Sequence, residues 1–164
     1  MKLLDNIQKS IFEIRSLIQA EAEVRKLVYF DTKDALSQTA PTIEQSKDHF
    51  TVSAIFDVTQ PPFDKNTILS VVLNRANFDD ENVMMRNSVK INILTRSDLW
   101  ELDNNVIRPL EIANIVSSIL NNKKVSPSHK LLLSSIELAI LNEDVNGYTV
   151  TFLMEEGSGL DEQF

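Results

Sequence analysis

Few side chains in this sequence have the type and spacing that chemistry requires. The chain contains no cysteine, which excludes disulfides, thiolate metal sites and a cysteine nucleophile. Its two histidines, His49 and His129, are far apart in the sequence and neither belongs to a metal-ligand spacing, so we interpret both as surface residues. The nucleotide-binding motifs and the G-x-S-x-G motif of serine nucleophiles are absent.

Two acidic segments are the remaining candidates for a chemical site. Asp79-Asp80-Glu81 carries carboxylates that can chelate a hard cation, but it lacks the glycine and alternating ligands of a calcium loop, which favours a solvated turn. The acidic residues of segment 98–103 suggest a carboxylate pair, yet they also fit a loop that leads into a helix capped by Asp103 or Asn104. We therefore predict no enzyme activity, no metal site and no cofactor.

Exposed aromatic residues favour protein binding instead. Trp100 lies in an expected loop, where it either anchors a partner or covers the end of the core. Phe63 follows two prolines in another expected loop. These two residues, together with Asp79 and Asp80, are the possible protein-contact residues. Sheet edges are further places where a partner can bind.

The charge of the chain argues against binding to nucleic-acid phosphates. The net charge is −8 and the sequence pI is about 4.7, so the overall field repels DNA and RNA. Half of this net charge comes from the last ten residues, which contain four acidic and no basic side chains. We interpret 156–164 as a flexible acidic C-terminal tail.

Hydrophobic periodicity predicts the elements that position these residues. Apolar residues at steps of three and four predict helices over about 3–27 and 105–121, with Pro109 in the first turn of the second. Apolar and β-branched runs predict strands over 51–58, 67–73, 89–93, 131–141 and 148–154. The first two strands should pair as an antiparallel hairpin, and Gly147 should form the turn of a second hairpin. Segments 31–48, 59–66 and 77–88 are expected to be loops, with one helical turn at Asp34-Ala35-Leu36.

This order of elements predicts an α+β fold with a mostly antiparallel sheet of about five strands and two helices packed on one face. Residues 1–155 should form a single domain, followed by the acidic tail. The N-terminus lacks the apolar run of a signal peptide, and no stretch is long enough to span a membrane. We therefore expect that the protein assembles in the cytoplasm and does not associate with a membrane.

From the first helix to Met154, the chain resembles the tail-terminator and neck (head–tail joining) proteins of tailed bacteriophages. The resemblance lies in the order of elements and in short stretches within them: helix 7–27, Asp34-Ala35-Leu36, strand 89–95, the helix Arg108-Pro109-Leu110-Glu111-Ile112-Ala113-Asn114-Ile115-Val116, the step 121–125, and Gly147-Tyr148-Thr149-Val150. It covers about nine tenths of the chain, and its features are patterns of hydrophobicity and order.

The resemblance implies a virion protein that forms a homo-oligomeric ring, commonly a hexamer, at the head-proximal end of the tail. Such a ring terminates tail-tube polymerisation and joins the tail to the neck, so its partners would be the tail tube protein, a neck or connector protein and, in a contractile tail, the sheath. DNA would pass through the lumen without specific binding, which fits the negative charge. The loops 31–48, 59–66 and 77–88 would contact neighbours and the tube.

Two other hypotheses make different predictions. A small monomeric adaptor or inhibitor would bind one protein partner through Trp100 or the acidic tail, and it would stay monomeric at high concentration. An enzyme with a carboxylate site in segment 98–103 would need a deep pocket with perturbed carboxyl groups. We rank the ring first, because only self-association into a closed ring follows from the resemblance.

Overall fold

A computed structural model describes residues 4–53, 65–78, 84–126 and 129–156. Its centre is a six-stranded sheet in the order β1-β2-β3-β8-β7-β6. The strands are β1 (Phe50–Thr51), β2 (Thr67–Phe78), β3 (Met84–Arg96), β6 (Lys124–Ser126), β7 (His129–Ile140) and β8 (Val145–Glu156). The four long strands β2, β3, β8 and β7 are antiparallel to their neighbours.

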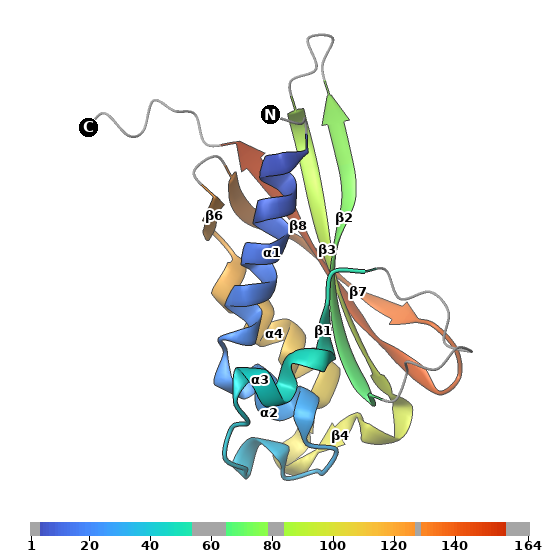
Figure 1. The fold of residues 1–164 in the computed structure, drawn as a ribbon. Coiled ribbons are helices and arrows are strands. Elements are labelled where there is room, and N and C mark those ends of the chain that lie inside the picture. The colour runs from blue at the N-terminus through green and yellow to red at the C-terminus, as the bar shows by residue number, and fades with distance from the viewer. Residues whose placement is uncertain (1–3, 54–64, 79–83, 127–128, 157–164) are drawn as a thin grey trace.

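The helices lie together on one face of this sheet (Figure 1). They are α1 (Asp5–Gln19), α2 (Ala22–Tyr29), the short α3 (Ile43–Ser46) and α4 (Arg108–Leu120). Buried apolar residues of the helices pack against buried apolar residues on the inner face of β2, β3 and β8. The helices contribute Ile14, Ile18, Leu27, Ile112 and Val116, and the strands contribute Leu69, Ile91, Ile93 and Phe152. The predicted α+β fold is confirmed, with six strands rather than about five. No helix among the described residues is long and apolar enough to span a membrane.

The predicted first helix, 3–27, is broken into two. The backbone of Glu21 is extended (ψ 113°), which ends α1 and starts α2 in a new direction. The guanidinium group of Arg25 stabilises this break, because it donates hydrogen bonds to the carbonyl oxygens of Gln19, Ala20 and Pro41. The break was not predictable from local residue types, since neither glycine nor proline occurs there.

The predicted antiparallel hairpin of 51–58 and 67–73 is wrong where the structure describes it. β1 contains only Phe50 and Thr51, and it runs parallel to β2, with Phe50 opposite Leu69. A parallel pair needs a long crossover rather than a tight turn, and the 15 residues between Thr51 and β2 provide that length. Residues 54–58 lie outside the described residues.

The hairpin of β2 and β3 is longer than predicted. Segment 77–88 was expected to be a loop, but β2 continues to Phe78 and β3 begins at Met84. This end of the hairpin contains buried polar residues, since Asn87 and Ser88 are only 2% and 6% exposed. Segment 31–48 contains a 3-10 turn at Ala35–Ser37, close to the predicted position, then the short helix α3 and the start of a second 3-10 turn at Lys47–His49.

Helix α4 starts later than predicted and has no side-chain cap. Its N-cap residue is Ile107, so the expected capping by Asp103 or Asn104 does not occur. Asn104 and Asn105 have positive φ angles of 63° and 60° and form the turn between the two-residue strands β4 (Glu101–Leu102) and β5 (Val106–Ile107). Asparagine tolerates this left-handed backbone better than most residues, which explains the turn. Pro109 does lie in the first turn of α4.

Arg108 joins the ends of three segments behind the sheet. Its side chain is only 1% exposed, and its guanidinium group donates hydrogen bonds to the carbonyl oxygens of Leu27, Phe30, Thr32 and Leu99. Leu27 and Phe30 lie at the C-terminal end of α2, where a positive charge is favourable. Burial lowers the pKa of this guanidinium group, and the nearby Asp31 carboxylate partly opposes that shift. Arginine stays charged even so.

Gly147 lies within β8 and is not the predicted turn residue. A Cβ atom at this position would be 1.8 Å from the carbonyl oxygen of Ile93 on β3. The backbones of the two strands can therefore approach each other here only because the residue has no side chain. The turn itself spans residues 141–144, where the side-chain oxygen of Asn142 accepts hydrogen bonds from the amides of Asp144 and Val145.

Replacing Gly147 by alanine should force β3 and β8 apart. We expect G147A to lower the free energy of unfolding by about 2–3 kcal/mol, as overpacking of a core does. Urea denaturation measures this change. The control is A139G on the neighbouring strand, opposite Gly147, which should cost about 1 kcal/mol or less because only backbone entropy changes. If G147A and A139G lowered the free energy of unfolding equally, the close approach of β3 and β8 at Gly147 would not be the reason for the glycine.

Replacing Arg108 by methionine should leave four backbone carbonyl oxygens without their donor. We expect R108M to cost about 3–5 kcal/mol of unfolding free energy, measured by urea denaturation. R108K should recover less than half of this loss, because a single ammonium group cannot reach all four carbonyl oxygens on the two segments. The control R96M removes an exposed ion pair with Asp98 and should cost less than about 1 kcal/mol. A small effect of R108M would show that the segments are held by other contacts.

Candidate functional site

The most unusual surface of the protein is a row of apolar side chains on β7. Leu131, Leu133, Ile136, Leu138 and Ile140, which we call the β7 stripe, pair with β8 residues that point toward the helices. Exposure rises along the row: 0%, 38%, 41%, 58% and 71%. The stripe starts in the core and ends in solvent, so it continues the inner face of the sheet beyond the helices.

A β-bulge keeps all five side chains on one face. Successive residues of a strand point to opposite faces, so Leu133 and Ile136 would normally lie on different sides. The register shifts between Leu133 and Ser135, which leaves Ser134 as an extra residue. Ile136, Leu138 and Ile140 therefore lie on the same side as Leu131 and Leu133. However, that side is largely uncovered, since β7 runs away from the helices (Figure 1).

The outer edge of β7 is also open where the stripe is exposed. β6 pairs only with His129 and Lys130, and the backbone of Leu131 bonds to Asn122 and Lys123. The last hydrogen bond along this edge among the described residues is donated by the Leu133 amide to the side-chain oxygen of Asn121. Beyond Leu133, no described segment pairs with this edge. An exposed edge strand with an apolar face is a typical site for binding another protein.

Trp100 lies near the exposed half of this face. Its ring is 5.9 Å from the ring of Tyr148, which is the β8 partner of Leu138. Arg108 fixes the backbone here, because its amide donates to the Trp100 carbonyl oxygen and its side chain to that of Leu99. The ring is half-buried, and its Nε1 atom is buried without a hydrogen-bond partner among the described residues. Trp100 therefore covers the edge of the core and borders the stripe.

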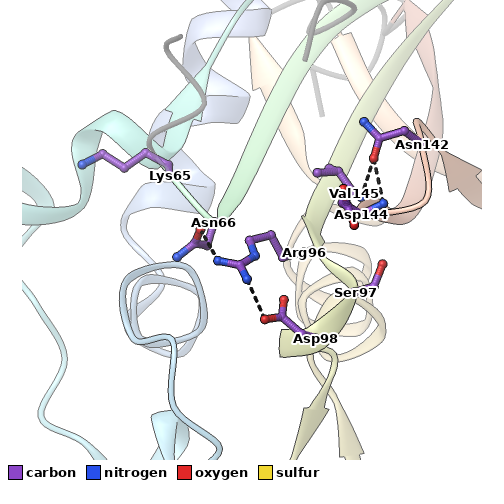
Figure 2. Close-up of a pocket in the computed structure, with 8 residues that line it drawn as sticks. All are labelled: Lys65, Asn66, Arg96, Ser97, Asp98, Asn142, Asp144 and Val145. Carbon is purple, nitrogen blue, oxygen red and sulfur yellow. Dashed lines mark hydrogen bonds and ion pairs between the residues drawn. The ribbon is translucent and has the colours of Figure 1, made fainter. Parts of the chain in front are cut away.

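A separate polar hollow of about 640 Å³ lies at the tips of β2, β3 and β8 (Figure 2). Its lining residues are Lys65, Asn66, Arg96, Ser97, Asp98, Asn142, Asp144 and Val145. Arg96 forms an ion pair of 2.7 Å with Asp98, and both side chains are at least half exposed. Both charges are therefore partnered and solvated, and the wide hollow lacks the convergent buried groups of a catalytic site.

The remaining sequence-based candidates do not form a site in the part of the chain that the structure describes. Phe63, Asp79 and Asp80 lie outside the described residues. In the described ranges, no three metal-binding side chains come together.

The expectation that both histidines are on the surface is wrong. His49 and His129 are 7% and 1% exposed. The His49 Nδ1 atom is 2.8 Å from the carbonyl oxygen of Thr67, and burial lowers the pKa of this imidazole. The His129 Nδ1 atom is 3.1 Å from the Ser10 hydroxyl, so this ring links β7 to α1. Each histidine joins two elements of the fold, which their isolated positions in the sequence did not indicate.

Comparisons with known proteins identify a family. The family model YomW, which describes a phage-associated, SPBc2 prophage-like domain, matches residues 21–154. The match begins at α2 and includes the β7 stripe and the six-stranded sheet except the last two residues of β8. No curated protein matches the sequence.

Polar substitutions in the exposed part of the stripe should leave the fold intact. We expect the double variant L138T/I140T to change the free energy of unfolding by less than about 1 kcal/mol, because threonine favours strands and both sites are exposed. The matched variant L131A, at the buried end, should cost about 2–5 kcal/mol. Urea denaturation gives both values, and binding of a hydrophobic dye should fall only in L138T/I140T. If L138T/I140T lowers the free energy of unfolding as much as L131A does, the stripe is covered in the folded protein.

Proposed function

The chain belongs to the YomW family of phage-associated proteins, and on that premise we propose that it is a structural virion protein that forms a ring at the head-proximal end of a phage tail. The ring would terminate tail-tube polymerisation and join the tail to the neck. It would be assembled in the host cytoplasm and would have no enzyme activity. Its partners would be copies of itself, commonly six, the tail tube protein, a neck or connector protein and, in a contractile tail, the sheath.

The observation that carries this proposal is the exposed β7 stripe on an open strand edge. Leu138 and Ile140 expose 58% and 71% of their surface, although such apolar side chains are usually covered in a finished assembly. A ring requires each copy to present a surface that a neighbouring copy covers. The stripe and its open edge can serve as that surface.

The charge of the chain supports the proposed position in the virion. DNA must pass through a ring at this place without binding to its wall. A net charge of −8 repels phosphates, and it favours passage over retention. The charge is consistent with a lumen that carries DNA.

The proposed function predicts concentration-dependent self-association. Mass photometry and light scattering of the purified protein, alone and with tail-tube and neck proteins of the same phage, should reveal a closed ring of one defined size. L138T/I140T should weaken ring formation, whereas L153T should not, because Leu153 is 44% exposed on the opposite face of the sheet. A strict monomer that binds none of these components would overturn the proposal and favour a monomeric adaptor.

A further inference from the structure

We propose that the open edge of β7 binds the open edge of β2 of a second copy of this chain, so that the sheets of successive copies join head to tail. The inference rests on the proposed function in one respect, since it describes how a ring would be built. It goes further by naming both surfaces of the contact. The evidence comes from strand direction, apolar residues and charge.

The direction of the strands makes this contact geometrically simple. The long strands form the order β2-β3-β8-β7, and each is antiparallel to the next. The two outer strands therefore run in opposite directions. A second copy related by rotation about a ring axis would bring its β2 beside β7 as an antiparallel neighbour, with its helices on the same side. Each copy would extend the sheet of the last one.

Short strands leave complementary halves of the two edges open. β1 pairs with β2 at Leu69 and Ser70, so the outer edge of β2 is open from Val71 onward. β6 and the bonds near Asn121 occupy β7 as far as Leu133, so its edge is open from Ser134 onward. These statements concern the described residues. Both open segments follow the covered start of their strand, and they can pair if the copies are staggered along the strands.

The apolar residues define this stagger. Within one copy, the cross-strand pairs place Leu138 level with Leu69. Pairing Leu138 with Leu73 of the next copy, and Ile140 with Val71, shifts the strands by four residues and keeps all four side chains on the helix-facing side. A shift of four residues across four strands corresponds to a strand tilt of about 35°. Closed sheets tilt by about 35–45°, so the stagger is compatible with a closed ring.

Opposite charges lie next to each other in this register. Glu137 and Arg75 are exposed and lie on the outer face of the sheet, opposite to the stripe. The register of Leu138 with Leu73 places Glu137 beside Asn74 and Arg75, where β2 has a bulge. Neither charged group forms an ion pair with a described residue of its own chain. In the head-to-tail contact each would gain a partner.

Disulfide trapping tests the contact directly, because the natural chain has no cysteine. In the double variant L138C/L73C, the paired Cα atoms of neighbouring copies should lie within the distance that a disulfide spans. We expect mild oxidation of the full-length protein to give a ladder of covalent oligomers on a non-reducing gel. The control L138C/L153C, which has its second cysteine on the outer face, should give no ladder. Urea denaturation confirms that each variant is folded.

Charge exchange in the trapping variant provides a second test. We expect either E137R or R75E, added to L138C/L73C, to reduce the yield of the ladder about tenfold, because like charges then face each other. The combination E137R/R75E should restore it. A combination that traps no better than the single reversals would overturn the proposed register.

The results separate this inference from the proposed function. A ladder that requires both cysteines supports the head-to-tail contact. A covalent dimer from L138C alone would show a symmetric β7–β7 contact and overturn it, as would the absence of any ladder from the folded double variant. Mass photometry detects the ring independently of the disulfides. A ring that gives no covalent ladder would therefore refute the β7–β2 contact and leave the proposed function standing.

Discussion

The arrangement of the protein depends on the buried guanidinium group of Arg108. Burying a charge costs several kcal/mol unless its hydrogen bonds are replaced, and here four backbone carbonyl oxygens, three in residues 27–32 and one at Leu99, replace them. The same residue begins α4 and holds the chain at Trp100. Arg108 therefore links the helix layer, at the ends of α2 and α4, to the segment at Leu99 and Trp100. The part of β7 beyond that layer is the part whose apolar side chains remain exposed.

The sequence predicted the elements that depend on local periodicity and missed those that depend on distant contacts. The amphipathic α4 and the alternation of β8 follow from residue spacing, and the α+β fold follows from their order. The break at Glu21 depends on Arg25 reaching across to Pro41, and the parallel β1 depends on a crossover. The role of Gly147 depends on the backbone of β3. None of these partners is visible in a local window of sequence.

The candidate site was partly readable from the sequence. The spacing of Ile136, Leu138 and Ile140 identified an apolar strand face, and the offset from Leu131 and Leu133 was a signal for the bulge at Ser134. Spacing does not reveal whether other elements cover that face, because coverage depends on the position of the helices. The pattern therefore predicted a strand with one apolar side, and it did not predict that much of this row is in solvent. The uncovered strand edge is the observation from which we propose that the protein binds copies of itself.

Amide hydrogen exchange, compared between the dispersed and the assembled protein, tests the central claim most directly. Exchange reports backbone hydrogen bonds, and an open strand edge gains them when another strand pairs with it. We expect assembly to slow exchange in the open segments 134–140 and 71–78, with little change in the central strands. Assembly that protects other surfaces and leaves both segments unchanged would contradict the claim that these edges form the contact.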